Sequence, residues 1–229
     1  MPAARTDEAS ARRRARALRI AGLYAVTPDL EDTDDLAARA AAALSGGAAA
    51  IQYRNKSADP ALKRTQALAL ARVHALRGGV FIVNDDAALA ALAGADGVHI
   101  GDDDSSIAVA RDIVGPDRII GVSCYNDLAL AERAIAAGAD YVAFGSFFPS
   151  SVKPDARRAD VALLESARAL GVPVVAIGGI TAANARTLVD AGATAVAVIT
   201  AVFDAPDVLS AARAIANVFP SISLASVRP

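Results

Sequence analysis

One phrase occurs four times in this chain, and it constrains the fold more than any other feature. Each copy is an alanine-rich run that ends in a small residue, glycine and alanine, and a short apolar segment follows. The four glycines are Gly47, Gly94, Gly138 and Gly192. Because glycine readily adopts the left-handed conformation that ends many helices, each copy predicts a helix, a tight turn and a buried strand. Intervals of roughly 50 residues leave room for two β/α units per copy, which makes eight units.

Further short apolar segments between the copies supply the remaining strands. The expected strands cover residues 23–26, 50–53, 80–83, 97–100, 119–122, 141–144, 174–177 and 195–199, and helical patterns between them include residues 32–44, 60–76, 128–137, 161–170 and 206–218. Continuously apolar strands are typical of a parallel sheet that is buried on both faces. The sequence therefore predicts an α/β fold, a single closed (β/α)8 TIM barrel. An open, doubly wound sheet is the alternative, but no Gly-x-Gly-x-x-Gly follows the first strand.

The barrel domain is expected to span residues 20–220, with a tail at residues 221–229. Residues 1–19 differ in composition, because six arginines lie among alanines and no apolar stripe is visible. A transit peptide or a nucleic-acid-binding arm fits this composition, but a solvated, disordered extension fits it better. We therefore expect removal of residues 1–18 to leave folding and turnover nearly unchanged.

Overall composition excludes several classes of partner. Lysine and arginine together number 23 against 25 aspartates and glutamates, so the net charge is -2. This balance favours neither nucleic acid nor an anionic membrane as a partner. The lone Cys124 cannot form an internal disulfide, which favours a reducing, cytoplasmic setting. Small molecules are the expected partners, and the sequence leaves homo-oligomerisation open.

Cationic side chains follow the second expected strand. Side chains of a strand alternate between its faces, so Gln52, Arg54 and Lys56 project to one side. In a barrel of this kind the reacting groups lie at the carboxyl ends of the strands. An amide and two cations in a row at that rim predict an anion-binding site.

Acidic side chains follow the third and fourth strands. Aspartate commonly caps helices, and capping explains Asp86, Asp102 and Asp103 at least as well as ligand binding does. Oxygen ligands without histidine or thiol pairs suit Mg²⁺. Asp85 and Asp104 are the predicted magnesium ligands.

The later strands add hydroxyl groups, a third cation and glycine amides. The long loop of residues 145–155 contains Ser150, Ser151 and Lys153, which predicts a lid or an anion cradle. Gly178 and Gly179 follow the seventh strand and predict a phosphate site built from backbone amides.

No convincing nucleophile or general base accompanies these groups. Ser123 and Cys124 end the fifth strand, but no histidine is near them in sequence. His99 lies inside a strand and is expected to be a core or wall residue. The predicted cations, metal ligands and phosphate site suit a reaction in which diphosphate leaves under electrostatic stabilisation and another phosphorylated molecule attacks.

These motifs, taken in order, resemble the thiamine-phosphate synthase family. The resemblance rests on residues 22–27, 51–56, 83–85, 94–101, 121–123, 145–153 and 175–180. It implies a Mg²⁺-dependent barrel that joins 4-amino-2-methyl-5-(diphosphooxymethyl)pyrimidine to a thiazole ethyl phosphate, with release of diphosphate. The two phosphorylated molecules would then be the substrates of this chain.

The resemblance also implies roles for individual residues. Arg54, Lys56, Lys153 and Ser123 would be the catalytic residues, and Asp85 and Asp104 would bind the metal. The substrate-binding residues would be Gln52, Tyr53, Arg54, Asn55, Lys56, Asn84, Ser123, Ser150, Ser151, Val152, Lys153, Gly179, Ile199 and Thr200. Thr200 stands where the family more often has serine, and Val152 stands where it often has threonine, which removes one hydroxyl.

Two other functions fit the same fold. A thiazole tautomerase would need a proton-transfer residue rather than a metal, and the intact Gln52, Arg54 and Lys56 with Asp85 and Asp104 argue against it. A barrel that binds thiamine intermediates without turnover would not need a complete set of polar ligands.

Overall fold

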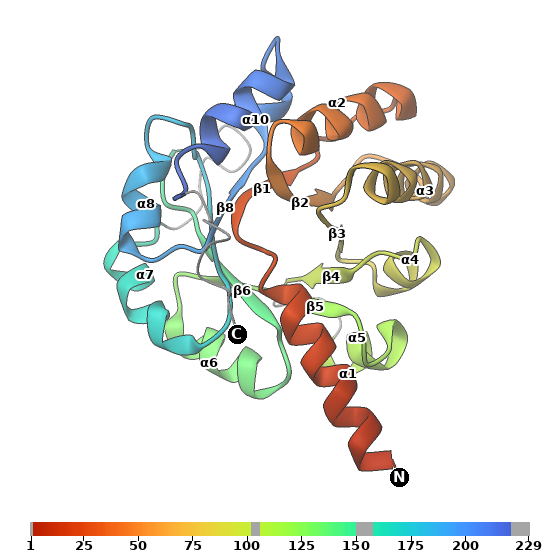
Figure 1. Ribbon diagram of the computed structural model, residues 1–229, viewed down its shortest axis with the longest axis vertical. Helices are drawn as coiled ribbons and strands as arrows, with labels where there is room; N and C mark the ends of the chain where they lie inside the picture. Colours follow the sequence, from red (N-terminus) through yellow and green to blue (C-terminus); the bar gives the residue numbers. More distant parts are fainter. Residues whose placement is uncertain (1, 102–105, 150–157, 221–229) are drawn as a thin grey trace, which may run out of the picture.

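The computed structural model describes residues 2–101, 106–149 and 158–220, and it contains a closed barrel of eight parallel strands (Figure 1). The strands are β1 (Gly22–Val26), β2 (Ala48–Tyr53), β3 (Val80–Asn84), β4 (Gly97–Ile100), β5 (Ile119–Tyr125), β6 (Tyr141–Gly145), β7 (Val174–Ile177) and β8 (Ala195–Val198). Each strand pairs with the next, and β8 pairs with β1. This closure confirms the predicted (β/α)8 barrel and excludes the open sheet.

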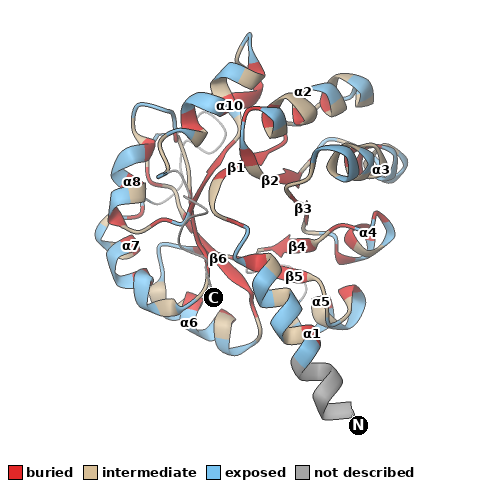
Figure 2. Cartoon of the chain, viewed as in Figure 1, coloured by how far each residue is buried: buried red, intermediate tan, exposed pale blue. Residues whose placement is uncertain are grey.

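Helices surround the barrel and turn their buried faces toward the strands (Figure 2). They are α2 (Thr33–Ser45), α3 (Pro60–Arg77), α4 (Ala87–Leu92), α5 (Ile107–Val114), α6 (Leu128–Ala136), α7 (Ala162–Ala167), α8 (Ala185–Ala191), α9 (Thr200–Phe203) and α10 (Val208–Ala216), with the 3-10 helix η1 (Arg168–Leu170) directly after α7. In the described part of the chain, none of the helices has both the length and the apolar character that crossing a membrane requires.

The four repeated glycines all have left-handed backbone conformations. Their φ angles are 102° at Gly47, 66° at Gly94, 105° at Gly138 and 119° at Gly192. Other residues adopt this region only at a steric cost. The predicted glycine turns between helix and strand are therefore confirmed, and they explain why the phrase recurs.

Two apolar layers stabilise the barrel. The outer layer fills the space between strands and helices and includes Leu36, Phe81 and Phe144. The inner layer fills the barrel itself and includes Tyr24 and Tyr141. Because strand side chains alternate, the position of a residue along its strand decides which layer it joins.

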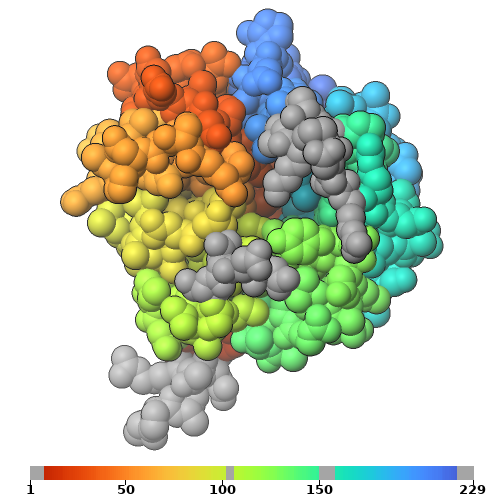
Figure 3. Space-filling model, turned by 180° about the vertical axis from the view of Figure 1, so that it is seen from behind, coloured from red at the N-terminus to blue at the C-terminus, as the bar shows by residue number. Residues whose placement is uncertain are grey.

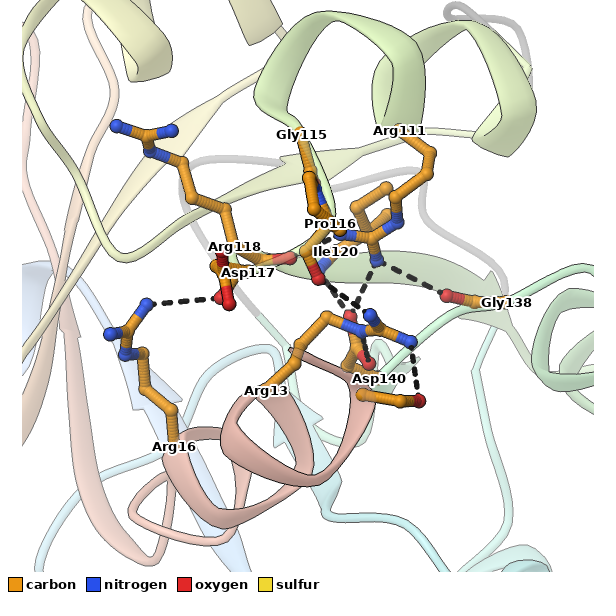
Figure 4. Close-up of polar contacts among 11 residues, drawn as sticks. Arg13, Arg16, Arg111, Gly115, Pro116, Asp117, Arg118, Ile120, Gly138 and Asp140 are labelled. Atoms are coloured by element: carbon orange, nitrogen blue, oxygen red, sulfur yellow. Dashed lines mark hydrogen bonds and ion pairs between the residues drawn. The ribbon is translucent and has the colours of Figure 1, made fainter. Parts of the chain in front are cut away.

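The N-terminal segment requires a correction, because the expected solvated extension is helix α1 (Pro2–Ala17). The Arg13 guanidinium donates to the Asp140 carboxylate, 2.6 Å from Nε to Oδ1, and to the carbonyl oxygen of Pro116 at 2.7 Å (Figure 4). Arg16 donates to the carbonyl oxygen of Asp117 at 3.0 Å. These partners directly precede β5 and β6, so α1 lies across the amino-terminal ends of the strands.

The sequence did not predict this docked helix because the face of α1 that contacts the barrel contains almost no large apolar residue. Ala9, Arg13 and Ala17 recur at four-residue spacing, and Ala9 and Ala17 are 4% and 2% exposed. Small residues allow close approach, and the Arg13 charge is balanced by an aspartate whose side chain is 4% exposed. Directly after the helix, Ile20 is fully buried in the inner layer of the barrel.

Candidate active site

The rim at the carboxyl ends of β2 and β3 contains a cavity of about 340 Å³. Arg54 and Lys56 line it from the β2 side, Asn84 and Asp85 from the β3 side, and Lys63 from α3. The chain that follows β2 and the chain that follows β3 lie side by side when the molecule is seen from behind the view of Figure 1 (Figure 3). The structure thus brings the predicted cations and one predicted metal ligand into a single cavity.

Residues at the end of β1 hold Arg54 in place. The Thr27 hydroxyl accepts a hydrogen bond from the Arg54 backbone N–H and donates one to the Arg54 carbonyl oxygen, both at 2.9 Å. The Asp29 carboxylate accepts from Arg54 Nη1 and from the Lys56 backbone N–H, both at 3.0 Å. The side chain of Arg54 is only 18% exposed. A mostly buried guanidinium with fixed backbone and side-chain contacts is preorganised for an anion.

Tyr53 and Asn55, predicted as substrate-binding residues, also line the cavity, but their polar atoms are used within the protein. Tyr53 packs in the outer layer, and its hydroxyl donates to Gln66 Oε1 at 2.9 Å. Asn55 Nδ2 donates to the Leu30 carbonyl oxygen at 2.8 Å and to Gln66 Oε1 at 3.0 Å. Burial and the nearby Asp29 charge raise the pKa of Tyr53, so its hydroxyl stays protonated. These two residues support the loop that presents Arg54 and Lys56.

Asp85 has a backbone conformation that few residues other than glycine adopt. Its φ is 62°, and its N–H donates to the His99 carbonyl oxygen at 2.7 Å, which ties the end of β3 to β4. Such positive φ values cost free energy and tend to occur at functional positions. The neighbouring Asp86 caps α4 by accepting from the Leu89 N–H at 2.8 Å, which confirms the capping interpretation for Asp86.

The second predicted metal ligand, Asp104, lies outside the described residues. Within the described ranges, no three His, Cys, Asp or Glu side chains form a group that could hold a metal ion. The side chains near Asp85 in the cavity offer oxygen donors, which are the ligands that Mg²⁺ prefers.

The barrel interior links Ser123 to Gln52 through three further side chains. His99 Nε2 lies 2.9 Å from Ser123 Oγ, and His99 Nδ1 lies 2.9 Å from Tyr141 Oη. Tyr141 Oη lies 2.8 Å from Tyr24 Oη, which accepts from Gln52 Nε2 at 2.9 Å. No histidine is near Ser123 in sequence, but β4 pairs with β5, and this pairing brings His99 to Ser123 in space. His99 is a wall residue, as expected, but it contacts a predicted site residue.

The opposite part of the rim is formed by the segments after β6, β7 and β8. Gly179 has a φ of 61°, and a Cβ there would lie 2.2 Å from the Pro149 carbonyl oxygen, so only glycine fits this contact. Ile199 packs against the inner layer, and Thr200 is an exposed residue at the start of α9. Four further predictions, Ser150, Ser151, Val152 and Lys153, lie outside the described residues.

Three residues of the site were missed at the level of sequence. Lys63 lies in a helical stretch, although it is one of only three lysines in an arginine-rich chain, and that rarity was the available signal. Asp29 lies after β1, and its position at the carboxyl end of a barrel strand was the available signal. No local signal singled out Tyr141, because it reads as an ordinary apolar strand residue.

The sequence model of one family, described as thiamine monophosphate synthase, matches residues 23–202. A thiamine-phosphate synthase of Thiobacillus denitrificans is 58% identical over 199 residues, which cover 86% of this chain and 94% of the relative. A thiamine-phosphate synthase of Chromobacterium violaceum is 55% identical over 201 residues, which cover 88% of this chain and 97% of the relative.

A solved structure shows the same architecture at lower identity. The thiamine phosphate pyrophosphorylase of Pyrococcus furiosus superposes with a TM-score of 0.79 at 35% identity, and the match covers 89% of this chain and 96% of that one. The family match begins in β1, so it does not include α1.

Proposed function

This chain belongs to the thiamine monophosphate synthase family, and from that premise we propose how its barrel rim joins a pyrimidine diphosphate to a thiazole phosphate. The chain is an enzyme of the transferase class, and its products are thiamine phosphate and diphosphate. The observation that carries the proposal is the group of Arg54, Lys56 and Lys63 around one cavity, beside Asn84 and Asp85.

The cations act on the leaving group. Diphosphate gains negative charge as its bond to the pyrimidine methylene carbon breaks, and preorganised positive groups stabilise developing charge. Arg54 is held by Thr27 and Asp29 before substrate binds, so little reorganisation is needed at that side chain. Lys153 is proposed to complete this set from the loop after β6.

No general base is required by this scheme. The C–O bond to diphosphate breaks first, with help from electron donation by the amino group of the pyrimidine ring. The resulting cation is captured by the thiazole nitrogen, which uses its own lone pair to form the new C–N bond. The barrel walls exclude water, which would otherwise capture the cation.

Magnesium fits the oxygen donors of this rim. Asp85 would hold the ion together with Asp104, and Asp85 is presented by the strained turn after β3. When bound, Mg²⁺ supplies further positive charge that neutralises the diphosphate oxygens.

The thiazole phosphate is proposed to bind on the other side of the barrel. Gly179, Ile199 and Thr200 follow β7 and β8 there. Backbone amides next to glycine can approach a phosphate closely, which suits this part of the rim. Ser150, Ser151 and Val152 would border the same substrate. A cytoplasmic setting is part of the proposal and is supported by the single, fully buried Cys124.

The test is a coupling assay with both substrates and Mg²⁺. Thiamine phosphate and diphosphate should appear in equal amounts, and omission of either substrate should abolish both products. Incubation with the thiazole precursor alone examines the tautomerase alternative. Isomerisation without coupling, or binding of both substrates without turnover, would contradict the proposed function.

A further inference from the structure

A continuous chain of five polar side chains crosses the interior of the barrel. It runs from Gln52 on β2 through Tyr24, Tyr141 and His99 to Ser123 on β5, and each contact is 2.8 or 2.9 Å long. Tyr24 and Tyr141 are at most 2% exposed, and Gln52 and His99 are 5% and 7% exposed. The family resemblance gives roles only to the two end residues, Gln52 and Ser123, and the three residues between them have none.

The barrel makes room for this chain at one specific position. A Cβ at Gly121 would lie 1.9 Å from the Cζ atom of Tyr141, so the Tyr141 ring occupies the space that a side chain would fill. The His99 ring stacks on the Tyr141 ring with centroids 5.5 Å apart. The residue at position 121 thus allows the tyrosine to reach His99.

Only the first contact has a fixed direction, in which Gln52 Nε2 donates to Tyr24 Oη. The geometry of the other three contacts allows either group to donate, and one order lets each hydroxyl donate to the next group. In that order Tyr24 donates to Tyr141, Tyr141 donates to His99 Nδ1, and His99 Nε2 donates to Ser123 Oγ. Burial raises the pKa of both tyrosines, so both hydroxyls keep the protons that this order needs. In this order the His99 ring carries a proton on Nε2 and accepts at Nδ1.

Gln52 and Ser123, at the two ends of this series of hydrogen bonds, are left with opposite hydrogen-bonding capacity. The Gln52 carbonyl oxygen has no hydrogen-bond partner in the described part of the chain, and no side-chain oxygen or nitrogen there is both buried and without a partner, so this oxygen faces accessible space. It can accept a hydrogen bond. In the order given above, Ser123 Oγ accepts from His99, so its own proton remains for donation.

We propose that His99, Tyr141 and Tyr24 are positioning residues that fix Gln52 as an acceptor and Ser123 as a donor toward the substrate ring. This inference rests on the proposed function, because the ring in question is the pyrimidine. A 4-aminopyrimidine offers amine protons and ring nitrogen acceptors, and it matches this polarity. A 4-oxopyrimidine carries a carbonyl oxygen and a ring N–H in their place, and a site with fixed polar groups rejects such an analogue.

The test combines nuclear magnetic resonance with kinetics. The chain has two histidines, so ¹⁵N-histidine labelling gives two imidazoles, and His74, which contacts Asp96, is an internal reference. Wild type should show the Nε2–H tautomer at His99. Tyr141→Phe should give a mixture of tautomers at His99 only, together with about a tenfold loss of kcat/KM for the aminopyrimidine substrate, as for one lost hydrogen bond. The 4-oxo analogue is measured as a competitive inhibitor. Together with kcat/KM, the discrimination of Tyr141→Phe against this analogue should fall.

Ile215→Val is the matched control, because Ile215 is buried in the outer layer on α10, away from the chain of hydrogen bonds. This variant should lower the melting temperature, but the His99 tautomer and the discrimination against the 4-oxo analogue should stay unchanged. If Tyr141→Phe does not fold, Tyr24→Phe breaks the same chain one contact earlier. An Nδ1–H tautomer in wild type, or unchanged discrimination in both tyrosine variants, would overturn the proposal. A wild type with the Nε2–H tautomer but without coupling activity would support the assigned polarity and refute the proposed function.

Discussion

The guanidinium of Arg13 lies 2.6 Å from the buried carboxylate of Asp140, and this contact joins helix α1 to the start of β6. The same carboxylate accepts from Arg111 Nη2 at 2.8 Å and from the Ile120 N–H at 2.9 Å. Burial lowers the pKa of Arg111, as does the nearby Arg13 charge, while Asp140 opposes both effects. Asp140 thus organises the amino-terminal end of the barrel, at the opposite end of the strands from the rim.

Arg13→Ala should destabilise the fold without reducing turnover at room temperature. The variant removes one of the hydrogen-bonding partners of a buried carboxylate, which costs about 1–3 kcal/mol. For a chain of this size that corresponds to a fall of about 3–10 °C in melting temperature. Calorimetry of Arg13→Ala beside Arg14→Ala, whose side chain is exposed on the same helix, measures the effect. Equal melting temperatures would restore the expectation that the segment is dispensable.

Arg54→Ala should abolish most of the activity while the protein stays folded. Removal of a preorganised group that stabilises developing charge costs on the order of 10² or more in kcat. Arg64→Ala, an exposed arginine on α3, is the control for loss of a positive charge near the rim. Steady-state kinetics of the coupling reaction compare the two variants. A similar, small loss in both would mean that general surface charge, not Arg54 itself, acts on the diphosphate.

Lys63→Ala should raise KM for the pyrimidine diphosphate several-fold with little change in kcat. Lys63 lines the cavity from α3 and has no fixed partner among the described side chains, so we expect it to contribute to substrate binding in both ground and transition state. Lys63→Arg keeps the charge and should retain the wild-type KM. The KM difference should shrink at high salt, because exposed charges are screened. A kcat defect that Lys63→Arg does not rescue would contradict this role.

Asp85→Asn should increase the magnesium concentration needed for turnover by about tenfold or more, because hard divalent cations depend on ligand charge. Asparagine tolerates the positive φ at this position, so the fold should be preserved. Asp86→Asn is the control, since asparagine caps a helix about as well as aspartate. A magnesium titration of wild type and both variants, with chelator as the zero point, measures the shift. Wild-type activity that survives chelator would remove the metal from the proposal.

Local sequence features determined the architecture and one half of the rim. The repeated glycines mark the turns because a left-handed backbone is intrinsically easier for glycine, whatever surrounds it. Strand alternation separates Arg54 and Gln52 from Tyr53, because that period is built into an extended chain. The capping role of Asp86 could also be predicted from its position before a helix, because an N-cap contact is local in sequence.

Only the tertiary structure decided what lies inside and beneath the barrel. Ser123 and His99 are 24 residues apart, His99 and Tyr141 are 42 apart, and Tyr24 and Tyr141 are 117 apart. Barrel closure brings these side chains together, and no local pattern encodes which inward-facing residues then meet. The contact of Arg13 with Asp140 spans 127 residues, and its helix docks through alanines, which carry almost no signal of burial in sequence. The alternation of side chains along a strand is a property of its own backbone. Which side chains meet across the core depends on the packing of the whole chain.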